Sequence, residues 1–178
     1  MDDDVSGPHQ RVAEIVREAA LSWPQCRPES TAVLVFTPED ADASGGAEET
    51  DDGLDPYEAA FQATLADGEP VLILVVDLLD QEGERLLATL GATVAGDRLF
   101  CSRLHDTTHR PEPSDDIAPL EATGSLEDLA RIAAGWFEEI VSRPVTGPTG
   151  RFGAWSFAAT GTVLAPGRRW LRNGSDAT

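Results

Sequence analysis

The sequence predicts an α+β (or α/β) fold, in which helices pack on a mixed sheet of about five strands and an antiparallel hairpin ends the chain. Two segments with helical periodicity, residues 9–23 and 125–143, lie near the start and towards the end of the chain. Between them, the uninterrupted apolar run VLILVV at residues 71–76 is typical of a buried strand. The final part carries aromatic and β-branched runs separated by glycine and proline, as antiparallel strands do.

The first half of the chain predicts two helices and two strands. Apolar residues on one face of 9–23 indicate an amphipathic helix, and the β-branched run at 32–36 indicates a strand. The stretch 55–68 begins with Asp-Pro and ends with Asp-Gly, which predicts a second helix. Because the run at 71–76 does not alternate, we expect it to be covered on both faces at the centre of the sheet. If the first strands are parallel, right-handed crossovers connect them.

The middle of the chain predicts a third helix followed by a hairpin. Asp80 is placed to be the N-cap of this helix, in which three leucines pack inward, and Gly91 marks its end. Residues 98–104 then supply a strand or hairpin that turns at 95–97. Residues 106–124 have loop composition, with three prolines and a Ser-Asp-Asp triplet.

Residues 125–143 have the clearest helical pattern in the chain. Ser125 is suited to be the N-cap, and Pro144 ends the helix because the residue before a proline is pushed out of the α region. Apolar residues fall on one face and charged residues on the other. Two ion pairs are predicted one turn apart: Glu127 with Arg131, and Glu139 with Arg143.

The C-terminal segment 151–171 predicts an antiparallel hairpin whose two strands flank Thr160-Gly161. A chain of 178 residues is long enough for one domain with a substantial core, so we expect residues 1–178 to form a single domain. Three stretches are expected to lie outside its packed part. They are the acidic tail 1–8, the acidic and disordered loop 39–55, and the tail 173–178.

Charge is the most unusual property of the sequence. The formal net charge is −19, and all 13 basic residues are arginines. Residues 1–142 carry a net charge of −23, whereas residues 143–178 carry +4. Such a field repels nucleic acid and anionic membranes and favours a basic protein partner. Solubility alone, adaptation to high salt and mimicry of a nucleic-acid backbone are alternative interpretations.

The sequence predicts a cytoplasmic location and no association with a membrane. No apolar run reaches the roughly 18 residues of a membrane span. The N-terminus is acidic and lacks the apolar core of a secretory signal. In a reducing compartment, we expect Cys26 and Cys101 to be reduced thiols.

Three possible metal ligands, Cys101, His105 and His109, are spaced four residues apart. Cysteine and histidine are the residues that hold zinc. The segment HDTTH is similar to the zinc-protease motif H-E-x-x-H, but aspartate replaces the glutamate and a proline follows two residues later. Paired C-x-x-C motifs are absent from the sequence. We therefore expect no metal site, with these three residues as weak candidates only.

Asp77 and Asp80 directly follow the apolar strand, and ligands collect at strand ends in open α/β sheets. A carboxylate there is a candidate general base or binding group. In the alternative interpretation, Asp77 only ends a strand and Asp80 only caps a helix. Nucleophile-elbow and phosphate-loop motifs are absent from the sequence. Residues 168–172 carry three arginines around Trp170, which suits a phosphate or a base, or else ion pairs with the chain's own acidic surface.

Two tryptophan-anchored blocks, WFEEIVSRPV at 136–145 and AWSFAATGTVL at 154–164, carry a resemblance. They resemble a family of small uncharacterised actinobacterial proteins with a W-F-E-x-x-x-x-R-P-V helix end and a W-x-F-A-x-T-G strand. The resemblance covers about a sixth of the chain. It implies that the helix and the strand form one unit, and it implies no activity, cofactor or catalytic residue.

The sequence favours a non-enzymatic cytoplasmic protein that binds a basic protein partner through an acidic surface. A regulatory, accessory or immunity-type protein fits this description, and we expect no cofactor and no catalytic residue, although an enzyme is not excluded. The outer side of the helix at 125–143 contributes to the acidic surface. The candidate binding residues are Glu48, Glu49, Asp51, Asp52 and Asp77. The alternative is a small-molecule-binding domain or enzyme with a pocket at the end of the strand at 71–76.

Overall fold

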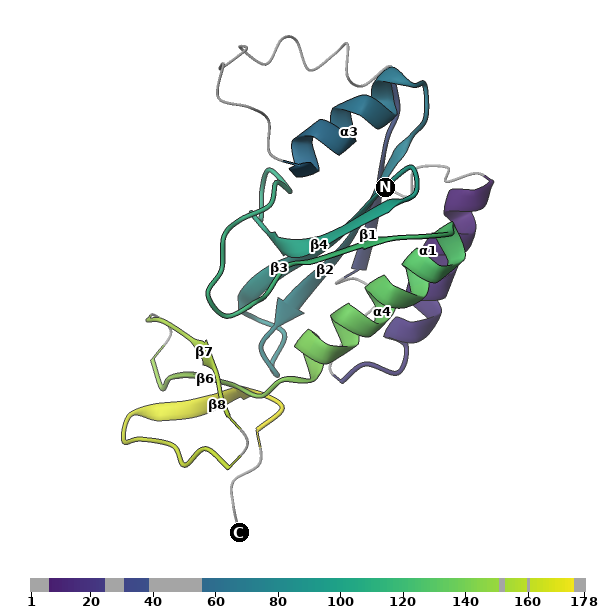
Figure 1. Ribbon diagram of the computed structural model, residues 1–178. Coiled ribbons are helices and arrows are strands. Elements are labelled where there is room, and N and C mark those ends of the chain that lie inside the picture. The colour runs from purple at the N-terminus through teal and green to yellow at the C-terminus, as the bar shows by residue number, and fades with distance from the viewer. Residues whose placement is uncertain (1–6, 25–30, 39–55, 151–152, 160, 175–178) are drawn as a thin grey trace, which may run out of the picture.

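A computed structural model describes residues 7–24, 31–38, 56–150, 153–159 and 161–174. The predicted acidic loop 39–55 lies outside the described residues, as do residues 1–6 and 175–178 of the two predicted tails. Within the described part, the chain forms two antiparallel sheets and three α-helices, and helices lie on both faces of the larger sheet (Figure 1).

A five-stranded antiparallel sheet forms the body of the molecule. Each strand pairs with the next one along the chain, in the order β1-β2-β3-β4-β5. The α+β class and the five-stranded sheet are therefore confirmed. The sheet is not mixed, because all of its neighbouring strands are antiparallel. Helix α3 (Pro56–Ala66) joins two such neighbours, β1 and β2, so the parallel arrangement on which right-handed crossovers depended is not present. The strands are β1 Thr31–Phe36, β2 Val71–Leu79, β3 Leu86–Ala95, β4 Arg98–Leu104 and β5 Leu120–Thr123.

Strand β2 is buried on both faces, as its continuous apolar run predicts. Leu72, Leu74, Val76 and Leu78 belong to the main core under the helices α1 (Pro8–Ala20) and α4 (Leu126–Ser142). Val71, Ile73 and Val75 belong to smaller apolar clusters on the other face, where Phe61 of α3 packs. A strand between two helical layers has no solvent side, which explains why its sequence does not alternate.

Residues 86–95 form strand β3, so the helix predicted between Asp80 and Gly91 is wrong. Alternate residues of β3 enter the main core, and the strand pairs with β2 on one side and β4 on the other. Asp80 caps a turn: its Oδ1 accepts hydrogen bonds from the main-chain N–H of Glu84 at 2.9 Å and of Arg85 at 3.3 Å. The turn predicted at 95–97 is confirmed, with Gly96 at a φ of 58° between β3 and β4.

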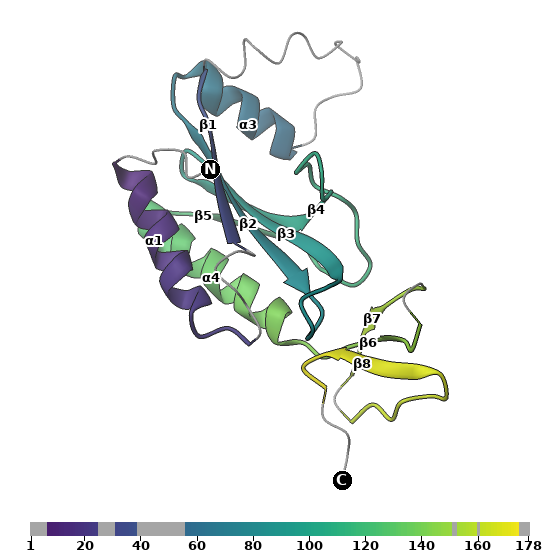
Figure 2. The same ribbon diagram turned by 180° about the vertical axis from the view of Figure 1, so that it is seen from behind.

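The helices α1 and α4 lie side by side on one face of the sheet (Figure 2). Both match their predicted segments closely. The Ser125 hydroxyl caps α4 by accepting a hydrogen bond from the main-chain N–H of Asp128 at 3.3 Å. The apolar face of α4, including Trp136 and Phe137, is buried. Among the described residues, no helix combines the length and apolar character needed to cross a membrane.

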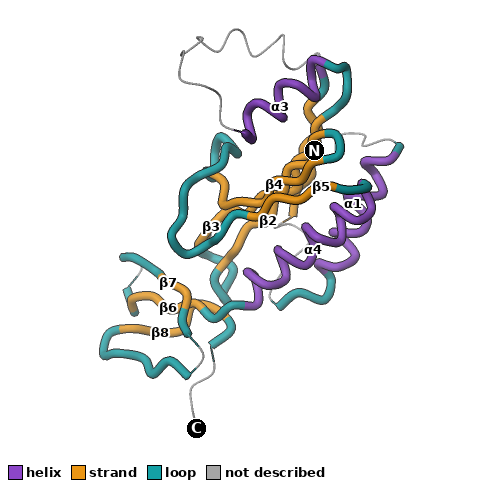
Figure 3. Tube along the Cα trace, viewed as in Figure 1, coloured by secondary structure: helices purple, strands orange, loops and turns teal. Residues whose placement is uncertain are grey.

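The C-terminal segment forms a second sheet of three strands, which lies at one end of the larger sheet (Figure 3). Strand β6 (Val145–Pro148) is central, and β7 (Ser156–Phe157) and β8 (Arg168–Arg172) pair with its two edges. The predicted hairpin around residues 160–161 is therefore wrong, because the first of its strands pairs with β6 and residues 162–165 form no strand. Leu171 of β8 belongs to the main core, so the second sheet is joined to the body.

Candidate functional site

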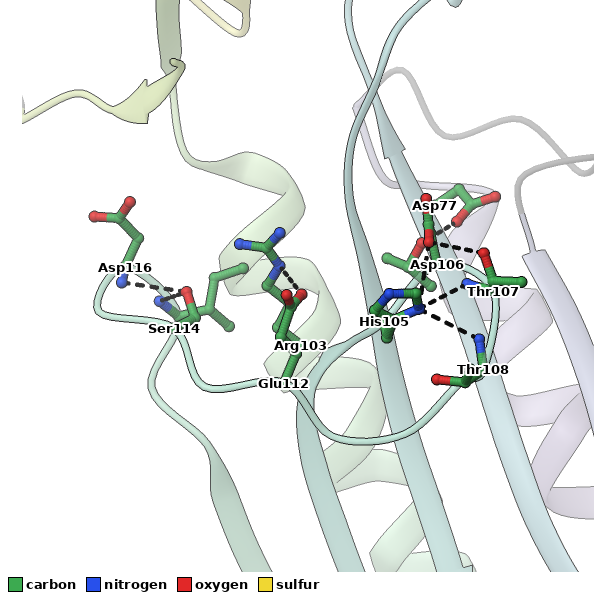
Figure 4. Close-up of polar contacts among 11 residues, drawn as sticks. Asp77, Arg103, His105, Asp106, Thr107, Thr108, Glu112, Ser114 and Asp116 are labelled. Carbon is green, nitrogen blue, oxygen red and sulfur yellow. Dashed lines mark hydrogen bonds and ion pairs between the residues drawn. The ribbon is translucent and has the colours of Figure 1, made fainter. Parts of the chain in front are cut away.

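Asp77 lies within β2 and not beyond its end, because the strand continues to Leu79. Its carboxylate is half-buried and accepts a hydrogen bond from the hydroxyl of Thr89 on the neighbouring strand at 2.9 Å (Figure 4). The bond joins residues that are directly opposite each other in the β2–β3 register. In this position, the carboxylate serves as a cross-strand hydrogen-bond acceptor.

A shallow hollow of about 200 Å³ lies on β4 and β5, two strands away from Asp77. The guanidinium carbon of Arg98 lies 4.9 Å from the centre of the Phe100 ring, and Tyr57 contacts the same ring edge-on at 5.7 Å. The residues that line the hollow are Arg98, Leu99, Phe100, Glu121, Ala122 and Thr123. Asp77 is not among the residues that line this hollow, so the pocket expected beside Asp77 stays a prediction.

The structure does not bring Cys101, His105 and His109 into one site. Cys101 is 1% exposed in the main core, and burial raises the pKa of its thiol to about 12. His105 lies in the exposed loop after β4, where its Nδ1 accepts a hydrogen bond from the main-chain N–H of Thr107 at 3.3 Å (Figure 4). Among the described residues, no group of three or more His, Cys, Asp or Glu side chains could hold a metal ion.

The structure describes only part of the predicted acidic surface. Glu48, Glu49, Asp51 and Asp52 lie outside the described residues. On α4, the predicted ion pair is present, with Arg131 Nη2 at 2.6 Å from Glu127 Oε1, and Arg131 also contacts Asp128 at 3.1 Å. These two carboxylates are therefore partly neutralised within the helix.

The ion pair predicted between Glu139 and Arg143 does not form. Arg143 instead lies over the ring of Phe157, with its guanidinium carbon 3.8 Å from the ring centre. Its Nη1 donates a hydrogen bond to the main-chain carbonyl of Asp116 at 2.8 Å. Glu139 is exposed and makes no ion pair with any described residue.

The loop before β5, which carries Asp115 and Asp116, is joined to this end of α4 by hydrogen bonds to its main chain. Ile117 of the loop is 2% exposed in the main core. Trp136 and Arg143 both donate hydrogen bonds to this loop. Glu139 is three residues from the first and four from the second, so it lies on the same side of α4. Asp115 and Asp116 are exposed and, like Glu139, make no ion pair within the described part of the chain. We call Asp115, Asp116 and Glu139 the acidic patch.

The loop that carries the acidic patch is held by local hydrogen bonds. The Ser114 hydroxyl accepts hydrogen bonds from the main-chain N–H groups of Asp116 and Ile117, each at 3.3 Å (Figure 4). The Asp116 carboxylate points away from Ser114 in this view. The Ser-Asp-Asp triplet is the sequence signal for this turn, but composition indicated only a loop and did not place it beside α4.

The arginines at 168–172 are used inside the molecule. Arg168 Nη2 donates hydrogen bonds to the Thr146 and Ser156 hydroxyls at 2.8 and 3.1 Å. Arg169 forms an ion pair with Glu82 at 3.4 Å. Arg172 is 1% exposed and donates to the main-chain carbonyls of three segments: Pro24, Leu79 and Val141. These contacts leave little of the arginine cluster for binding a phosphate or a base.

Comparison of this chain with protein-family models, curated proteins and solved structures finds no match. The resemblance of the two tryptophan-anchored blocks to an actinobacterial family therefore stays a prediction. The blocks do meet in the structure, because Val145 at the end of the first block pairs with Phe157 in the second.

Proposed function

We propose that this protein is a non-enzymatic, cytoplasmic binding protein of the regulatory or accessory kind, whose acidic surface engages a basic protein partner. The acidic patch, three exposed carboxylates without a counterion in the described part of the chain, carries the proposal. The net charge of −19 supports it, because such a field accelerates the approach of a basic partner.

The patch is supported by rigid parts of the molecule. One of its residues lies on α4, and the other two lie on a loop fixed by the Ser114 hydroxyl and by the buried side chain of Ile117. Because the main chain that carries these carboxylates is held before a partner arrives, binding costs less conformational entropy than it would on a mobile segment. An immunity-type protein that covers a basic active surface is one form that this function takes.

A pull-down with the full chain tests the proposal. The bait is compared with a patch variant, Asp115→Asn/Asp116→Asn/Glu139→Gln, and with a control variant, Asp67→Asn/Asp97→Asn/Glu138→Gln, which changes the net charge equally at other exposed positions. We expect the wild type and the control to retain a basic protein at low salt and to release it at about 0.5 M NaCl, where the Debye length is only a few ångströms. The patch variant should not retain it.

Two results would contradict this function. The first is that no basic protein is retained at low salt. The second is that both triple variants lose the partner to the same extent, which would mean that total charge and not the patch attracts it.

A further inference from the structure

Strand β5 is an edge of the larger sheet. It pairs with β4 on one side, and no described strand pairs with its other side. The strand and the segments that flank it belong to residues 56–150, which are described without a gap. Just after the strand, the N–H of Gly124 donates a hydrogen bond to the Asp97 carbonyl across from it at 3.0 Å. This bond fixes which residues of β5 face β4.

Two residues of β5 turn their main-chain groups away from the sheet. In an antiparallel pair, alternate residues bond to the same neighbour, so Leu120 and Ala122 face β4 as Gly124 does. Glu121 and Thr123 therefore direct their N–H and C=O groups outward. These groups bond to no residue in the described part of the chain, and both residues are exposed. The outer edge of β5 thus has two donors and two acceptors available to another strand.

Charge limits which segments can use this edge. Proteins often place a charged residue on an edge strand to prevent unwanted pairing. Glu121 is exposed and makes no ion pair with any described residue. Its carboxylate repels an acidic segment and attracts a basic residue placed opposite it. The edge therefore favours a basic strand.

The hollow on β4 and β5 borders the same edge. Phe100 is directly opposite Glu121, and Arg98 is directly opposite Thr123, so all four side chains are on one face of the sheet. The Phe100 ring is 6% exposed and supplies apolar surface, while the Arg98 guanidinium is held over this ring. An aliphatic stem with a charged tip, as in lysine, suits a hollow that combines an apolar ring with the Glu121 carboxylate at its edge.

The acidic patch is within reach of the same strand. Asp116 precedes Leu120, the first residue of β5, by four residues, which span at most roughly 14 Å. A strand of ordinary length that pairs with β5 and continues beyond Leu120 is long enough to reach the patch. The edge, the hollow and the patch can therefore contact one extended segment.

We propose that an extended basic segment of the partner binds β5 as an additional antiparallel strand, with a lysine or arginine opposite Glu121. Main-chain bonds to Glu121 and Thr123 supply affinity, and the hollow and the carboxylates supply specificity. In such a pair, the residues that exchange hydrogen bonds lie directly opposite each other, with their side chains on one face. This proposal rests on the proposed function, because it specifies how the basic partner binds.

Synthetic peptides test the proposal directly. The probe is a fluorescein-labelled hexapeptide, Lys-Val-Lys-Val-Lys-Val, whose binding to the full chain at low salt is followed by fluorescence anisotropy. With lysine opposite Glu121, the lysine N–H groups face β5 and the valine N–H groups face solvent. N-methylation of the lysine residues should therefore weaken binding about tenfold or more, whereas N-methylation of the valine residues should change it less than about twofold. A Glu-Val hexapeptide should not bind.

Hydrogen exchange of the unmodified chain, followed by NMR, locates the peptide. The outward amides of Glu121 and Thr123 should exchange more slowly once the Lys-Val peptide is added. The Ala122 amide faces β4 and should change much less, as should the amides of the central strand β3. Protection that alternates along β5 is specific to strand addition, because a ligand held by charge alone does not distinguish neighbouring amides.

A pair of variants tests the role of the charge. Glu121→Gln should weaken binding of the Lys-Val peptide about two- to fivefold, because the residue opposite loses its ionic partner. Glu138→Gln removes the same charge from an exposed position on α4 and should leave binding unchanged. Equal effects of the two variants would overturn the placement of a basic residue opposite Glu121.

Failure of this proposal can be told apart from failure of the proposed function. Equal weakening by the two sets of methyl groups, peptide binding without protection of Glu121 and Thr123, or no binding of the Lys-Val peptide would each overturn strand addition. None of these results contradicts a basic partner at the acidic patch, which the pull-down tests separately. Alternating protection together with a pull-down that retains no basic protein would support β5 as a peptide site and contradict the proposed function.

Discussion

The indole of Trp136 donates its Nε1 hydrogen to the main-chain carbonyl of Ala118 at 3.3 Å. This bond joins the middle of α4 to the loop that carries two of the three carboxylates of the acidic patch. The ring is 6% exposed and contacts Phe137 edge-on at 5.3 Å. Trp136 therefore contributes both to the core and to the position of the proposed binding surface.

Substitution at Trp136 should separate these two roles. Trp136→Ala removes a buried aromatic side chain and should lower the free energy of unfolding by about 3–5 kcal/mol. Trp136→Phe keeps most of the apolar volume but loses the hydrogen bond, so a loss of about 1–2 kcal/mol is expected. Urea unfolding followed by circular dichroism measures both. A Trp136→Ala variant of unchanged stability that no longer retains a partner would place this residue in the interface and not in the core.

Arg172 should be far more important for stability than its neighbour Arg169. The Arg172 guanidinium is buried and donates to carbonyl oxygens of three separate segments, whereas Arg169 makes a partly exposed ion pair with Glu82. Lysine cannot reproduce this planar set of donors, so Arg172→Lys should cost about 2 kcal/mol or more. Arg169→Ala should cost less than about 1 kcal/mol. Equal losses in thermal or urea unfolding would refute this ranking.

Gly91 and Leu104 should be energetically coupled. A Cβ atom at residue 91 would lie 2.2 Å from Leu104 Cδ1, so Gly91→Ala should destabilise the protein by about 1–3 kcal/mol through overpacking. Leu104→Ala alone should cost about 2–5 kcal/mol by leaving a cavity. In the double variant, the new methyl group occupies part of that cavity, so the loss should be smaller than the sum of the two. Additive losses in a double-mutant cycle would contradict this packing.

His9 should make stability fall more steeply in mild acid. Burial lowers the pKa of His9, and the carboxylate of Glu69 opposes this shift only in part. Below the ordinary histidine pKa of about 6.5, the unfolded chain therefore binds this proton more readily than the folded chain. The stabilisation by neutral His9 is present above that pH and is lost as pH falls through the lower, folded pKa. His9→Gln should lose less stability between pH 7 and 5 than the wild type, as measured by urea unfolding; parallel curves would contradict the shift.

Local patterns in the sequence were sufficient to predict those helices and strands whose signal lies within a single segment of the chain. The amphipathic periodicity of α1 and α4, the Ser125 cap and the continuous apolar run of β2 all predicted the observed elements. A local pattern was misleading for residues 86–95. Leu86, Leu87 and Leu90 have helical spacing, but pairing with β2 and β4 makes residues 86–95 a strand, in which Leu87 and Leu90 are buried and Leu86 is exposed. Helix propensity is a weak preference that such pairing overrides.

Less of the candidate site than of the fold could be predicted from the sequence. Asp115 and Asp116 are over 20 residues from Glu139 in the chain, and composition alone gave no reason to place them together. Arg143 could be expected to pair with Glu139 one helical turn away, but Phe157 and the Asp116 carbonyl take it instead. Contacts between distant segments decided which carboxylates were left without a counterion.

The sequence by itself determined the class of the fold, the large negative charge, both amphipathic helices and the doubly buried strand, because each depends on composition or on spacing within one segment. Tertiary structure alone decided that β3 is a strand, that β6 takes β7 and β8 on its two edges, and that Arg172 binds carbonyls from three segments. The physical reason is that main-chain and guanidinium donors take the acceptors that packing brings near. Those acceptors lie far away along the chain, beyond the reach of any local pattern.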